Sequence, residues 1–106
     1  MEEIEQLIRA KALVRLSGIF KVPVAALTPE CRFGDDLKAS FISDFRRNEF
    51  DQVNDDIHDV ADRTIAKELG SGNLTIKTVG DYCDHMVRCS KTKRKDVVKL
   101  LGIDQA

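Results

Sequence analysis

The sequence predicts a small all-α protein, and three observations support this fold class. Apolar residues recur at helical spacing in every patterned segment, and none alternates apolar and polar residues over five or more positions. The chain has 106 residues, enough for one domain with a modest core. Only two prolines and six glycines interrupt it. This composition argues against long disordered segments.

The first predicted helix runs from Glu2 to about Phe20. Its first turn is acidic, and the partial positive charge at a helix N-terminus favours acidic residues there. We expect this helix to be buried on more than one side. One face holds Ile4, Leu7, Ile8 and Val14, and Leu13 and Leu16 widen the apolar stripe.

The connection from Val24 to Asp36 has three apolar anchors, Val24, Leu27 and Phe33. We therefore expect an ordered loop that packs on the helices.

From Ser40 to Leu69 the apolar positions keep helical spacing, which predicts one long helix or two abutting helices. A break is expected between Arg46 and Glu49, because Asn48 is a good helix cap. The run from Gly70 to Asn73 should end the element.

A further helix should begin after Thr78, whose hydroxyl can cap it with Asp81 three residues later. The run from Lys91 to Lys95 predicts a basic linker, followed by about two helical turns from Asp96 to Leu101. We expect this short helix to fold back onto the predicted second helix, which is acidic from Asp44 to Asp62, or else to bind a partner protein. The predicted organisation is a helical bundle over residues 1–90 and a basic linker with a C-terminal helix over residues 91–106.

The predicted core draws on the helices and on the loop between the first two of them. Its members are Leu7, Ile8, Leu27, Phe33, Phe45, Val53, Ile57, Val60, Val79, Tyr82 and Met86.

The run FGDDLKASF, residues 33–41, resembles the prosthetic-group site of acyl carrier proteins. Phe33, Asp36, Leu37, Ser40 and Phe41 follow the order of the family motif, although the spacing before the serine is one residue short and the acidic residue before it is absent. The run TVGDYCDHM, residues 78–86, resembles the family's last helix. The resemblance covers about residues 4–89. It implies a small helical bundle with an extra C-terminal helix.

The same resemblance implies a non-catalytic function. Ser40 would carry 4'-phosphopantetheine, whose thiol holds an acyl chain as a thioester. The implied partners are acyl-transfer or synthase enzymes and a phosphopantetheinyl transferase, in fatty acid or polyketide biosynthesis.

A second alignment of the motif is also open. The stretch from Phe41 to Asp51 repeats the pattern eight residues later with ungapped spacing, and it puts Glu49 at the position of the serine. A carboxylate cannot accept phosphopantetheine. This alignment implies a carrier-like interaction module that has lost the prosthetic group.

The acidic second helix is the docking surface that the resemblance implies. Scattered carboxylates attract basic patches on partner enzymes and raise the rate of encounter. The carboxylates expected to take part are Asp36, Asp44, Glu49, Asp51, Asp55, Asp56, Asp59 and Asp62.

Metal binding and catalysis find little support in the sequence. Cys83, His85 and Cys89 lie within two turns, but Cys83 belongs to the apolar stripe and no complementary pair of ligands is nearby. His58 lies among aspartates without a nucleophile or a second base, and we expect it on the surface. The sequence therefore predicts neither a metal site nor an enzyme.

Charge and apolar pattern decide the remaining expectations. The basic run from Lys91 to Lys95 has no interleaved aromatic residues, and the acidic body would repel phosphates, so nucleic acid is a poor partner. No apolar run approaches the roughly 20 residues of a membrane-spanning helix.

Three cysteines without a disulfide framework suit a reducing compartment. We expect a cytoplasmic monomer.

Overall fold

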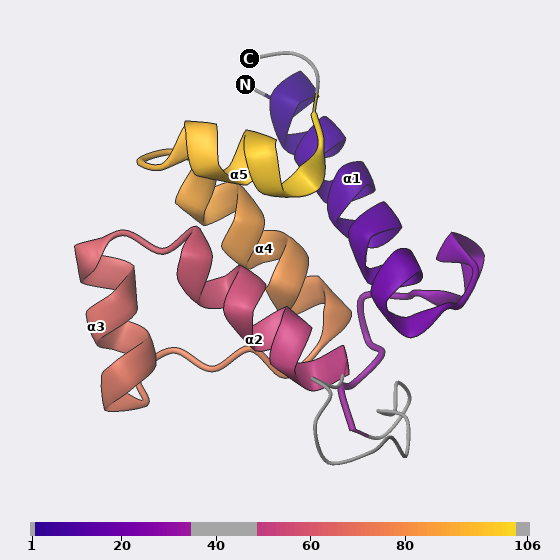
Figure 1. The fold of residues 1–106 in the computed structure, drawn as a ribbon, viewed down its shortest axis with the longest axis horizontal. Helices are drawn as coiled ribbons and strands as arrows, with labels where there is room; N and C mark the ends of the chain where they lie inside the picture. Colours follow the sequence, from indigo (N-terminus) through magenta and orange to yellow (C-terminus); the bar gives the residue numbers. More distant parts are fainter. Residues whose placement is uncertain (1, 35–48, 104–106) are drawn as a thin grey trace.

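The computed structural model describes residues 2–34 and 49–103, which form five α-helices and one short 3-10 helix (Figure 1). The all-α prediction is confirmed, since the described residues contain no strand beyond an isolated bridge between Arg32 and Thr78. No helix in these two ranges has the length and apolar character needed to cross a membrane. The elements are α1 (Glu2–Phe20), η1 (Val24–Ala26), α2 (Glu49–Asp59), α3 (Arg63–Ser71), α4 (Val79–Ser90) and α5 (Arg94–Leu101).

Helix α4 is the centre of the bundle. It packs against α1, α2 and α5 (Figure 1), and seven of its twelve residues are buried. Helix α5 lies mainly on α4 and α1, so the expected fold-back onto α2 is wrong. Its contribution to the common core is Val97 and Leu101, with Ile103 just after the helix.

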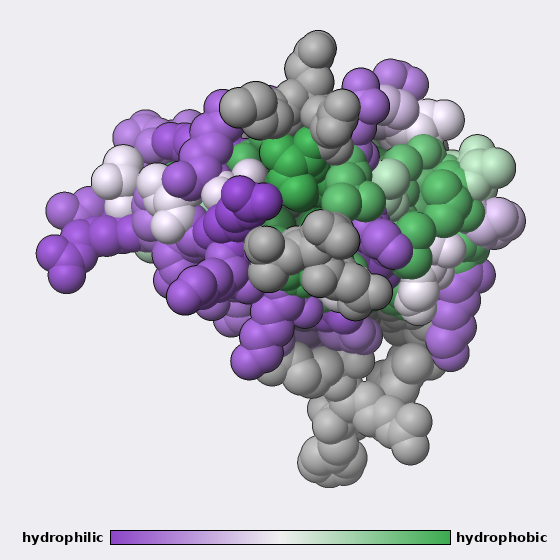
Figure 2. Space-filling view, turned by 90° about the horizontal axis from the view of Figure 1, so that it is seen from above, coloured by the Kyte–Doolittle hydropathy of each residue, from purple (hydrophilic) through white to green (hydrophobic). Residues whose placement is uncertain are grey.

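Helix α1 has the predicted bounds but buries one side only. Its core residues are Ile8, Ala12, Leu16, Ile19 and Phe20, and the helix packs mainly against α4. Val14, which the sequence placed on the apolar face of this helix, is 54% exposed. The reason is geometric, because residue 14 lies on the side of the helix away from α4 and no other described element covers it. Hydrophobic residues visible in Figure 2 gather over the half of the molecule that holds α1 and η1.

The second patterned segment is divided at a position that the sequence reading missed. Helix α2 ends at Asp59, and α3 begins after Asp62, whose Oδ1 accepts a hydrogen bond from the backbone N–H of Ile65 at 2.8 Å. This cap satisfies an orphan N–H at the start of α3. The break expected between residues 46 and 49 falls largely outside the described residues. The predicted end is confirmed, because Gly72 takes a left-handed conformation with φ of 84°.

The predicted cap of α4 is also confirmed. Thr78 Oγ1 accepts from the backbone N–H of Asp81 at 3.1 Å, and Asp81 Oδ2 accepts from the backbone N–H of Thr78 at 3.2 Å.

The predicted core is largely present. Leu7 and Phe33 are only half-buried, and Phe45 lies outside the described residues. The predicted members that are buried are Ile8, Leu27, Val53, Ile57, Val60, Val79, Tyr82 and Met86.

Candidate functional site

The loop that follows η1 is held against the start of α4, as the sequence predicted for an ordered loop. The backbone N–H of Phe33 donates to the carbonyl of Lys77 at 2.9 Å, and the N–H of Val79 donates to the carbonyl of Cys31 at 2.9 Å. Leu27 is buried among the helices. The chain is therefore fixed up to the point where residues 35–48 begin.

Three aromatic rings join α1, this loop and α2. The ring of Phe33 stacks on that of Phe20, with centroids 5.9 Å apart and an interplanar angle of 21°. Phe20 also contacts Phe50 at a centroid distance of 6.0 Å and an angle of 56°. Aromatic pairs in these arrangements are favourable beyond the area that they bury. The start of α2 is thus held near the end of the loop.

A cavity of about 210 Å³ lies beside these rings. It is bordered by the loop end, by the first turns of α2 and by the link before α4. Gly34 at the loop end and Phe50 in the first turn of α2 both line it. The sequence reading did not identify this cavity, although it predicted three of its apolar members as core. The lining residues are Phe33, Gly34, Phe50, Val53, Asn54, Ile57 and Ile76.

Four of the predicted site residues are affected by the limits of the described ranges. Ser40, Asp36 and Asp44 lie outside the described residues. Glu49 is the first residue of α2.

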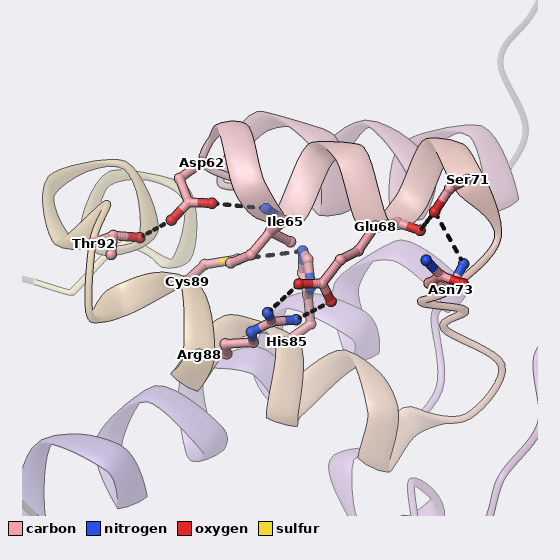
Figure 3. Close-up of polar contacts among 9 residues, drawn as sticks. All are labelled: Asp62, Ile65, Glu68, Ser71, Asn73, His85, Arg88, Cys89 and Thr92. Atoms are coloured by element: carbon pink, nitrogen blue, oxygen red, sulfur yellow. Dashed lines mark hydrogen bonds and ion pairs between the residues drawn. The ribbon is translucent and has the colours of Figure 1, made fainter.

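The remaining carboxylates have different environments. Asp51 and Asp59 are exposed and Asp55 is half-buried. Asp62 instead caps α3, and its Oδ2 accepts from the hydroxyl of Thr92 at 2.7 Å (Figure 3). Hydrogen bonds from the Ile65 N–H and from Thr92 lower the pKa of Asp62.

Asp56 does not belong to the exposed face, so its expected role in docking is wrong. It is 2% exposed. Nε and Nη2 of Arg15 each donate to it at 2.9 Å, and the hydroxyl of Tyr82 donates at 2.8 Å. The hydrogen bond to Asp56 raises the pKa of Arg15, and burial raises the pKa of Tyr82. Asp56 is thus the acceptor of a buried polar network that joins α1, α2 and α4.

The expected surface position of His58 is confirmed, whereas His85 is buried between α2 and α4. His85 Nε2 lies 2.8 Å from the carbonyl oxygen of Ile57 and 3.5 Å from Sγ of Cys89 (Figure 3). A ring nitrogen facing a carbonyl must carry the proton. Burial lowers the pKa of His85, which favours the neutral imidazole.

The buried cysteines have the character of core residues. Burial raises the pKa of both Cys83 and Cys89 to about 11, so neither is a ready thiolate. The predicted core position of Cys83 is confirmed. In residues 2–34 and 49–103, no three His, Cys, Asp or Glu side chains gather in a way that could hold a metal ion.

Helix α3 is held to α4 through polar groups at its surface. Nη1 and Nη2 of Arg88 donate to the two carboxylate oxygens of Glu68 at 2.8 and 2.6 Å (Figure 3). The one buried residue of α3 is Ile65.

Comparison of the chain with protein-family models, curated proteins and solved structures gave no match.

Proposed function

We propose that this chain is a non-catalytic acyl carrier protein, with 4'-phosphopantetheine attached at Ser40. The observation that carries the proposal is the cavity beside α2. Its rim includes Gly34 and Phe50, which stand just outside the two ends of the segment that contains Ser40. The proposal uses this apolar cavity as the binding site for the acyl chain.

The cavity suits the apolar cargo of such a carrier. At about 210 Å³ it is smaller than the roughly 300–1,000 Å³ of typical small-molecule pockets, which fits a short acyl chain. The prosthetic group would supply a flexible arm and a thiol that forms the thioester. The protein's own residues would bind the chain and exclude water, with Val53, Ile57 and Ile76 in contact with it and Asn54 at the polar edge.

The exposed carboxylates supply the proposed docking face for cytoplasmic acyl-transfer or synthase enzymes and for a phosphopantetheinyl transferase. Asp51, Asp55 and Asp59 repeat at intervals of four residues along α2, so they share one side of the helix. The proposal also assigns Asp36, Asp44, Glu49 and Asp62 to docking. Basic partner surfaces would meet it at rates that fall with rising salt.

The test is transfer of phosphopantetheine to the purified protein. The protein is incubated with coenzyme A and a broad-specificity transferase and is then weighed intact, alongside Ser40→Ala and the matched control Ser43→Ala. The proposal predicts a gain of one phosphopantetheine in the unsubstituted protein and in Ser43→Ala, but none in Ser40→Ala. A mass gain that is lost only in Ser43→Ala would show that Ser43, and not Ser40, carries the group. No mass gain with any transferase would contradict the proposal.

A second candidate function is a carrier-like interaction module without the prosthetic group. It rests on the second alignment of the motif, which puts Glu49 in the position of the serine. In this case the acidic face would bind partner enzymes unmodified. The variant Glu49→Ser separates the candidates: modification of this variant by the transferase, together with an unmodified parent, would support the module.

A further inference from the structure

We infer that a cavity between α4 and the link that joins α3 to α4 binds a small primary ammonium ion with a short apolar chain. The cavity has a volume of about 180 Å³. None of its polar lining residues lines the cavity beside α2. The ammonium site is therefore independent of the proposed carrier function.

The buried ring of His85 supplies the observation that points to a ligand. His85 is 3% exposed and lines the cavity. Its Nε2 carries the proton that faces the carbonyl of Ile57 at 2.8 Å, so Nδ1 of the neutral ring is an acceptor. Nδ1 is buried and has no hydrogen-bond partner among residues 2–34 and 49–103. A buried acceptor is costly unless a donor reaches it, and a molecule bound in the adjoining cavity can supply that donor.

Two carboxylates line the same cavity. Asp84 and His85 follow Asp81 by three and four residues, so the three side chains lie along one side of α4. The backbone N–H groups of Lys77 and Thr78 both donate to Oδ2 of Asp81, at 3.0 and 3.2 Å, which leaves Oδ1 to accept from a ligand. The side chain of Asp84 is 67% exposed and pairs with an arginine of α1 through Oδ1. The cavity thus offers several acceptors, and a cationic donor suits them.

Arg88 lines the cavity as well but does not attract an anion into it. Its Nη1 and Nη2 donate to the two carboxylate oxygens of Glu68 at 2.8 and 2.6 Å (Figure 3), so its charge is already balanced by α3. An anionic ligand would meet Asp81 and Asp84 and would find no donor at Nδ1 of His85. The charges around the cavity therefore favour a cation over an anion.

The size and the apolar walls of the cavity define the rest of the ligand. Leu74 and Ile76 of the link are half-buried and line it. A cavity of roughly 150 Å³ can hold one benzene molecule, so this one suits an ammonium ion with roughly three to five carbons. A metal ion fits less well, because no three His, Cys, Asp or Glu side chains of the described ranges are arranged to hold one. A ligand with so few atoms should bind with roughly millimolar affinity.

An NMR titration with n-butylammonium chloride, at constant ionic strength, tests the site. With ¹⁵N-labelled histidine, the Nδ1 resonance of His85 should shift as this atom accepts a hydrogen bond. The amide resonances of Leu74 and Ile76 should follow the same saturable curve. The ring of His58, which is exposed on α2, is the internal control and should not shift. Butyrate, which has the same chain length and the opposite charge, should not bind.

A pair of variants tests the role of the carboxylates. Asp84→Asn should weaken binding of butylammonium several-fold, because it removes one negative charge from the lining. Asp96→Asn changes an exposed aspartate of α5 that does not line the cavity, and it should bind like the parent. Circular dichroism should show equal helix content in both variants.

Four results would overturn the ammonium site. They are the absence of saturable binding of butylammonium, binding of butyrate as tight as that of butylammonium, equal affinities of Asp84→Asn and Asp96→Asn, and an Nδ1 resonance of His85 that is unchanged at saturation. The last result would mean that only water, and not the ligand, donates to this nitrogen.

Discussion

Arg15 and Asp56, 41 residues apart in the chain, form a two-pronged ion pair in which each of two guanidinium nitrogens lies 2.9 Å from a different carboxylate oxygen. The carboxylate is buried, whereas the Arg15 side chain keeps 37% of its surface exposed. Tyr82 donates a third hydrogen bond to the same carboxylate. Such a pair is costly to break from one side, because the remaining polar groups stay behind without their acceptor.

Replacing Asp56 by Ala should therefore lower the free energy of unfolding by about 3 kcal/mol. The loss arises because the Arg15 guanidinium and the Tyr82 hydroxyl would both lack a partner. Chemical denaturation with circular dichroism measures it. Asp59→Ala is the matched control on the same helix, and since Asp59 is exposed its effect should stay within about 0.5 kcal/mol. Equal effects of the two changes would show that the network does not stabilise the fold.

Asp56 also shows where sequence reasoning stops. Along α2 it is one aspartate among four, but it lies three residues after Val53 and four before Val60, so helical spacing places it on the apolar side and not with Asp55 and Asp59. The sequence reading grouped it with them and missed this signal. Spacing does not show its partners, because Arg15 and Tyr82 lie on two other helices.

Features set by local chemistry could be predicted. The bounds of α1 follow from its apolar spacing, and the start of α4 follows from the reciprocal cap of Thr78 and Asp81. The cap at Asp62 was a signal of the same kind, but the continuous apolar spacing across it concealed the break between α2 and α3. The exposure of Val14 and the cavity beside α2 depend on how whole helices pack. No spacing in the sequence reports such packing.

A side chain at Gly80 should press against Pro29 and destabilise the fold. A Cβ at this position would come within 3.1 Å of the carbonyl oxygen of Pro29 and 3.2 Å of its Cβ, where the loop packs on the start of α4. Gly80→Ala should lower the free energy of unfolding by about 1–2 kcal/mol. Gly70 in α3 has open space around it, so Gly70→Ala should instead stabilise by about 0.5–1 kcal/mol. Thermal denaturation of the two variants should thus give shifts of opposite sign.

Stability should depend on pH through His85. Burial lowers the pKa of His85 in the folded state, whereas the unfolded chain takes up a proton below about pH 6.5. The contribution is complete above that value and is lost as the pH falls towards the folded-state pKa, so the free energy of unfolding should decrease from about pH 7.5 to about pH 5. This window lies above the range in which the contributions of Asp62 and Glu68, whose pKa values are lowered, are lost with falling pH.

Two histidine variants assign that pH dependence. His85→Gln can still donate to the Ile57 carbonyl but cannot take up a proton, so its stability should change less over the same range. His58→Gln should keep the slope of the parent, because His58 is exposed. Denaturant titrations at several pH values give the slopes. A parent slope that survives in His85→Gln would assign the dependence to another group.

The three cysteines should differ in reactivity. Cys31 is half-buried, while Cys83 and Cys89 are buried with pKa values raised to about 11. With a disulfide reagent at about pH 8, one thiol should react quickly in the native protein, because thiolate is the reactive form. All three should react after denaturation. Cys31→Ser should remove the fast phase, and a fast phase that remains would show that α1 and α4 open more readily than their packing indicates.

The most direct test of the carrier account follows an acyl chain on the protein. The protein is loaded by the transferase from acetyl-coenzyme A or octanoyl-coenzyme A, and the backbone amide resonances of the two forms are compared by NMR. The account predicts that both adducts form and that the largest differences between them occur at Val53, Asn54, Ile57 and Ile76, which line the cavity beside α2. The carrier account would be contradicted if neither adduct forms. It would also be contradicted if the amide chemical shifts of these residues are the same for both chain lengths.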